Sequence, residues 1–98
     1  MTDREQYDEV CKELLDLLRT GFGGRSNPAL VAKVKASAQE AMRLADNNYV
    51  RERARSVVHW VEIACSPRKH APWGLERVEQ FAYEDAYRIR HAFPSPER

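Results

Sequence analysis

The fold is decided by residues 27–65, NPALVAKVKASAQEAMRLADNNYVRERARSVVHWVEIAC. The opening Asn-Pro pair is typical of a helix start, because Asn caps free backbone N–H groups and Pro at the first helical position has no N–H to leave unpaired. Apolar residues then recur every three or four positions, which predicts a helix over 28–46. The polar Asp-Asn-Asn run at 46–48 ends that helix and caps the next, predicted over 49–65.

The flanking segments carry the same helical spacing. Thr2 opens a capping-box sequence ahead of an apolar stripe, which predicts a helix over 3–20. Gly21 is expected to stop this helix in the left-handed conformation. A fourth helix is predicted over 74–93, before a Pro-Ser-Pro sequence. Four amphipathic helices with short connections predict an all-α fold, an antiparallel four-helix bundle.

Length and composition restrict the class of protein. A chain of 98 residues closes one core, so we expect a single helical domain over 1–98 and exclude a two-domain enzyme. Hydrophobic residues make up 43% and charged residues 32%, which is ordinary globular usage and excludes disordered and collagen-like chains.

The chain carries no sign of a membrane segment or of secretion. No apolar run approaches the roughly 18 residues that a membrane span needs, and the N-terminal residues are acidic. Cys11 and Cys65 both fall on apolar helical faces, where a free thiol behaves as a small hydrophobic group. We therefore expect a cytoplasmic protein with buried thiols and no contact with a membrane.

The predicted helix over 49–65 has more apolar surface than one core face requires. Tyr49, Trp60 and Ile63 lie together on a flank beside its core stripe. Two interpretations stay open. Either neighbouring helices cover this helix on two sides, or the flank binds a partner protein or a second copy of the chain through Trp60.

The predicted fourth helix raises two further questions. Tyr83 and Tyr87 are one turn apart on its polar side, where they are either ordinary surface residues or a contact patch for a partner. Asp85 falls inside the core stripe. We expect Arg or His to pair with its carboxylate and fix the register of the helices, because an unpaired buried charge is costly.

Charge is balanced overall but uneven along the chain. Residues 1–20 hold three basic and six acidic side chains, whereas 47–70 hold five basic and two acidic ones. A basic patch is therefore predicted, made of Arg51, Arg55, Arg68 and Lys69. It is either a solvated face or a surface that contacts phosphates or an acidic protein. A dedicated nucleic-acid binder normally has a larger basic excess, so nucleic acid is the less favoured partner.

The chemical motifs of common catalytic and metal sites are missing from the sequence. The Gly-rich stretch at 21–24 has neither the preceding strand nor the Lys of a phosphate-binding loop. The His and Cys residues have no spacing that would place two ligands on one side of a metal ion. We expect no cofactor, no metal and no catalytic residue.

One pair of residues on the predicted helix over 49–65 suggests a catalytic function instead. Arg53 and His59, separated by Ala-Arg-Ser-Val-Val, resemble the Arg-x(4–6)-His motif of the HEPN helical ribonucleases. That resemblance implies that Arg53 binds phosphate and His59 transfers a proton. It covers only seven residues, and six positions on a straight helix turn the two side chains about 120° apart.

The sequence thus predicts a non-catalytic protein-binding module, such as a small adaptor, inhibitor or regulatory subunit. Its partner-binding residues are expected to be Tyr49, Trp60, Ile63, Tyr83 and Tyr87, and a homodimer is one form of this hypothesis. The alternatives are a nucleic-acid-associated protein that uses the basic patch and, further, a small helical ribonuclease.

Overall fold

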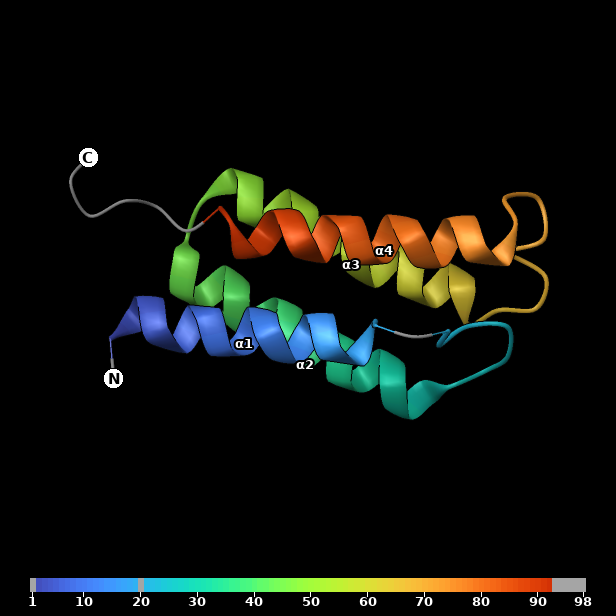
Figure 1. Ribbon diagram of the computed structural model, residues 1–98, viewed down its shortest axis with the longest axis horizontal. Coiled ribbons are helices and arrows are strands. Elements are labelled where there is room, and N and C mark those ends of the chain that lie inside the picture. Colours follow the sequence, from blue (N-terminus) through green and yellow to red (C-terminus); the bar gives the residue numbers. More distant parts are fainter. Residues whose placement is uncertain (1, 20, 93–98) are drawn as a thin grey trace.

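The computed structural model describes residues 2–19 and 21–92, and within them it contains four helices and no strand. The helices alternate in direction, so that each runs antiparallel to the one before it (Figure 1). They are α1 (Asp3–Leu17), α2 (Pro28–Ala45), α3 (Asn48–Ala64) and α4 (Leu75–Arg90). The predicted antiparallel four-helix bundle is confirmed.

The helix boundaries follow from caps that the sequence displays. Each of the first three helices begins after a residue whose side-chain oxygen accepts a hydrogen bond from the backbone N–H three residues on. These caps are Thr2, Asn27 and Asn47, with donor–acceptor distances of 3.2, 3.2 and 2.8 Å. Between α2 and α3, Asp46 takes a left-handed conformation with φ of 47°, which makes the turn short.

The predicted ranges need small corrections. Predicted and observed ends of α2 and α3 agree to within one residue, whereas α1 and α4 each end three residues before the predicted position. The stop after α1 is also different, because the left-handed glycine of this loop is Gly24, with φ of 98°, rather than Gly21. Thr20 and Phe93, the last residues of the predicted first and fourth helices, lie outside the described residues.

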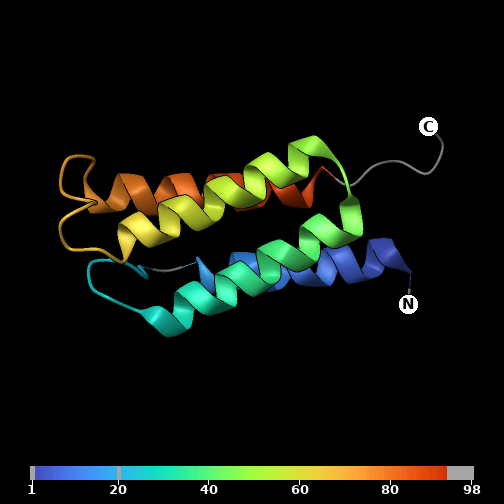
Figure 2. The same cartoon turned by 180° about the vertical axis from the view of Figure 1, so that it is seen from behind.

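The core is a continuous apolar interior to which all four helices contribute. Its largest fully buried side chains include Tyr7, Leu14, Val57 and Ile89. Each helix packs against two others in a ring, α1 with α2 and α4, and α3 with α2 and α4. Figure 2 shows the side of the bundle on which α2 and α3 face the viewer. No helix of the described part is long and apolar enough to cross a lipid bilayer.

Candidate functional site

The apolar flank of α3 is covered mainly by the chain itself. Ile63 is only 9% exposed and packs with Ala64 and Val78, so it is a core residue rather than part of a partner surface. Trp60 is half-buried, with ring centroids 4.9 Å from Phe81 and 5.4 Å from Trp73. The width of the apolar arc therefore reflects neighbours on both sides, the first of the two interpretations of this helix.

Tyr49, the third residue of that flank, lies on the surface. Its side chain is 45% exposed, and the guanidinium carbon of Arg53 lies 5.3 Å from the centroid of its ring. This distance fits a cation–π contact. The structure thus separates Tyr49 from Ile63, and the three residues do not form one apolar patch.

The two tyrosines of α4 also lie in different surroundings. Tyr83 is partly buried and packs against the core, and it lines a small hollow between α4 and residues that follow α1. Tyr87 is 52% exposed, and its ring centroid lies 4.7 Å from that of His91. Of the two tyrosines only Tyr87 is exposed, so the pair does not form one continuous exposed aromatic patch.

The predicted basic patch is divided into three places. Arg51 is engaged at the start of α3, where it donates to Asp46 at 2.9 Å and to Asn48 at 2.6 Å. Arg68 is an exposed residue of the loop between α3 and α4. The other two residues, Arg55 and Lys69, line hollows between α2 and α3.

These hollows follow one another along the surface that α2 and α3 share. Two cavities of about 360 and 380 Å³ adjoin each other, since both are lined by Lys35 and Glu62. We call them together the α2/α3 groove. Its lining residues are Ser26, Asn27, Pro28, Val31, Ala32, Lys35, Ala38, Gln39, Met42, Ala54, Arg55, Val58, His59, Glu62, Cys65 and Lys69.

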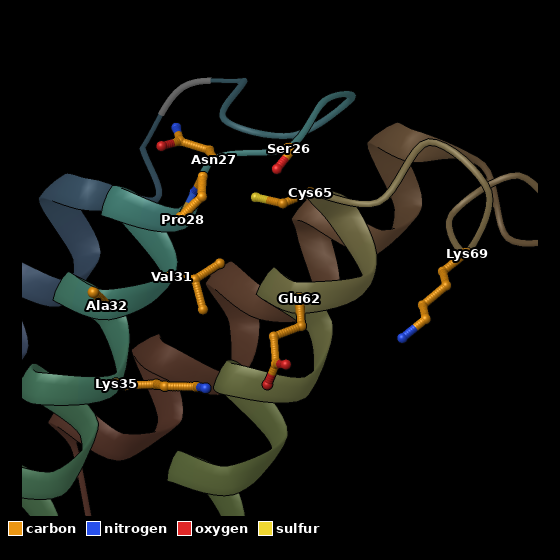
Figure 3. Close-up of a pocket in the computed structure, with 9 residues that line it drawn as sticks. All are labelled: Ser26, Asn27, Pro28, Val31, Ala32, Lys35, Glu62, Cys65 and Lys69. Carbon is orange, nitrogen blue, oxygen red and sulfur yellow. The ribbon is translucent and has the colours of Figure 1, made fainter.

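The groove combines an apolar floor with a charged rim. Val31, Met42 and Val58 are partly buried and pack against the core from the groove side. Figure 3 shows Val31 and Lys35 extending from α2 toward α3, while the carboxylate of Glu62 points toward the end of the Lys35 side chain. A floor of this kind with a polar rim is typical of protein-binding surfaces.

Cys65 lies at the end of the groove near the start of α2. Its sulfur points toward Pro28 in Figure 3, and the residue is 7% exposed. Burial, reinforced by the negative charge of Glu79, raises the pKa of this thiol above its usual value. The thiol therefore stays protonated at neutral pH, which makes it a poor nucleophile.

The structure places Arg53 and His59 in different surroundings. Arg53 faces α4, where its Nη1 lies 3.4 Å from Oδ1 of Asp85. His59 lines the α2/α3 groove and contacts Trp60, with ring centroids 5.1 Å apart. The two side chains are not brought together around a common phosphate position, as the separation of about 120° on one helix requires.

Asp85 behaves as its position in the core stripe predicts. The residue is 4% exposed, and its Oδ1 also accepts a hydrogen bond of 3.2 Å from Nη1 of Arg88. Its Oδ2 accepts a hydrogen bond from the hydroxyl of Ser56. The expected Asp–Arg pair between two helices is confirmed, and the carboxylate ties α4 to α3.

No pattern in the sequence pointed to a structural role for Glu79. Its Oε2 accepts hydrogen bonds from the backbone N–H groups of Phe22 and Gly23, at 2.7 and 2.8 Å, and so ties the loop after α1 to α4. The next amide, of Gly24, donates to the carbonyl of Ala64 at 2.7 Å. This loop is therefore held on the bundle by three hydrogen bonds.

Within residues 2–19 and 21–92, no group of three or more His, Cys, Asp or Glu side chains is arranged to hold a metal ion. The class of protein that the structure defines is thus a four-helix bundle with a groove on its surface. Comparison with known proteins adds no family, since no family model, no curated protein and no solved structure matches this chain.

Proposed function

We propose that this chain is a non-catalytic protein-binding module that holds a segment of its partner in the α2/α3 groove. An adaptor, an inhibitor or a regulatory subunit would each work in this way. The observation that carries the proposal is the pair of adjoining cavities with an apolar floor, Val31, Met42 and Val58, and a charged rim. Such a groove between two helices suits an added helix or an extended segment.

The α2/α3 groove lies on the side of α3 opposite its apolar flank, where the sequence placed the expected contact surface. Trp60 and Ile63 are engaged in packing within the bundle, whereas Arg55 and Lys69 of the predicted basic patch belong to the groove. Binding there requires no rearrangement of the core.

Nucleic acid is the second candidate partner. The observation that favours it is the presence of Lys35, Arg55 and Lys69 on one side of the molecule, because phosphate backbones select for such clusters. Binding to mixed single-stranded DNA and RNA at increasing salt tests this candidate. A steep loss of affinity with salt would move it ahead of the protein-binding proposal.

Site-specific photo-crosslinking in the native host tests the proposal. A photoreactive residue at Gln39, in the groove, is expected to give a covalent adduct with a partner. The same residue at the exposed Glu13 of α1 serves as the control. Adducts in equal yield from both positions, or from Glu13 alone, would contradict the proposal, and an adduct of twice the mass of the chain would identify a second copy as the partner.

A matched pair of groove variants strengthens this test. Ala32 and Ala36 are both exposed on α2, but only Ala32 lines the groove. Ala32→Trp fills the cavity and is expected to reduce the yield of the Gln39 adduct at least about tenfold, whereas Ala36→Trp leaves it unchanged. Equal effects of the two substitutions would show that the adduct does not report on groove binding.

A further inference from the structure

We infer that the segment held in the α2/α3 groove is an amphipathic helix with acidic flanks. This inference rests on the proposed function and specifies the chemistry of the partner. The groove has the length for it, because its lining on α2 runs from Pro28 to Met42, which at 1.5 Å per residue is about 20 Å. Three to four turns of a partner helix would fill this length, with apolar residues on the floor.

The charge of the rim points to carboxylates on the partner. Lys35, Arg55 and Lys69 line the groove, and none of them forms an ion pair with any described residue. Two cations outside the groove are paired, since Arg51 contacts Asp46 and Arg43 contacts Glu40. Among the described residues that line the groove, three basic side chains stand against one carboxylate, that of Glu62, and acidic residues of a partner would complement this net positive charge.

Glu62 distinguishes a protein partner from a nucleic acid. It is the one carboxylate among the described residues that line the groove, and it belongs to both cavities, so it lies at the middle. A continuous phosphate backbone along the groove would pass this negative charge and be repelled. A helix can instead place a Lys, Arg or Gln there, between acidic residues that meet Lys35, Arg55 and Lys69.

Three synthetic peptides and one oligonucleotide serve as probes for the full chain. The acidic peptide has about 18 residues, Leu at every third and fourth position and Glu on both flanks of the Leu stripe. The second peptide replaces each Glu by Lys, and the third keeps Glu but replaces each Leu by Ser. The oligonucleotide is a single-stranded DNA of mixed sequence. Binding is followed by NMR, through the methyl signals of Val31, Met42 and Val58.

We expect the acidic peptide to shift these methyl signals and to bind at least about tenfold more tightly than either control peptide. Lys35→Glu with Arg55→Glu should reverse the preference toward the Lys peptide. Lys33→Glu with Arg77→Glu makes the same change in net charge at exposed residues outside the groove, and it should leave the preference intact.

The other outcomes overturn the inference in distinguishable ways. Equal or tighter binding of the Lys peptide, with shifts of the groove methyl groups, would refute acidic flanks while leaving the groove as a protein-binding site. Stronger shifts with the DNA would identify phosphate as the preferred ligand. No shift of the groove signals with any probe would refute the inference, and the Gln39 crosslinking experiment then decides the proposed function separately.

Discussion

The hydroxyl of Tyr7 donates a hydrogen bond of 2.6 Å to the carbonyl oxygen of Ile89, so that the first turns of α1 are joined to the last turn of α4. Both side chains are fully buried. A carbonyl in the last turn of a helix lacks the usual intrahelical partner, and here it accepts from the tyrosine as well as from the N–H of Ala92 at 3.0 Å. This contact holds the N-terminal half of α1 against the C-terminal turn of α4.

Removal of that hydroxyl should destabilise the fold moderately. Tyr7→Phe keeps the buried ring and loses the bond to Ile89, so we expect the free energy of unfolding to fall by about 1 kcal/mol. The measurement is urea unfolding followed by circular dichroism. Tyr87→Phe, on the exposed Tyr87, is the control and should cost less than about 0.5 kcal/mol. Equal effects of the two changes would show that the Tyr7 bond contributes nothing.

The carboxylate of Asp85 should contribute to stability through α3. Asp85→Asn keeps the size of the side chain but removes the charge that Arg53 and Arg88 contact, and it disturbs the hydrogen bond from Ser56. We expect a loss of about 1–3 kcal/mol, below that of a fully buried pair because both arginines are partly exposed and regain water. The matched control is Asp8→Asn on the surface of α1, and a similar loss in both variants would contradict this role.

Two glycines of the loop between α1 and α2 should respond differently to substitution by alanine. At Gly23 a Cβ atom would lie 2.7 Å from the carbonyl oxygen of Ala64 and 2.9 Å from its Cβ, which forces the loop away from α3. We expect Gly23→Ala to cost about 1–3 kcal/mol in thermal or urea unfolding. At Gly21 the nearest atom would be a Glu79 oxygen at 3.7 Å, an ordinary contact. Gly21→Ala should therefore be close to neutral, and a larger loss there than at Gly23 would contradict the packing described.

Alkaline pH should destabilise the protein partly through Cys11. Burial raises the pKa of this thiol from 9.0 to about 11, so the folded state keeps its proton when the unfolded chain has lost it. The contribution of this thiol to the free energy of unfolding is fully present below about pH 9 and is lost as the pH rises toward about 11, by up to about 2–3 kcal/mol.

The check is the pH dependence of urea unfolding for the wild type and Cys11→Ala. The variant should lose stability less steeply over this interval, with a residual slope from Tyr7, whose pKa burial also raises. Parallel curves for the two proteins would show that the Cys11 thiol does not titrate differently on folding.

The sequence by itself determined the four helices and the caps of the first three. Apolar spacing identifies the inward side of a helix, and Thr2, Asn27 and Asn47 bind backbone groups only three residues away. The need of Asp85 for a basic partner, Arg or His, was also predictable, because it follows from the cost of an unpaired charge in a core. The spacing and the caps depend only on neighbouring residues of one helix, and the cost of a buried charge applies to any protein core.

Only the tertiary structure decided what covers each side of α3. The arc that holds Trp60 and Ile63 looks the same in sequence whether α4 or a partner protein packs on it, because apolar burial is not directional. The partners of Glu79 are backbone amides of Phe22 and Gly23, which no side-chain pattern reveals. The α2/α3 groove likewise depends on how far apart the two helices lie and on which side chains fill the space between them, and this distance is set by packing across the whole bundle.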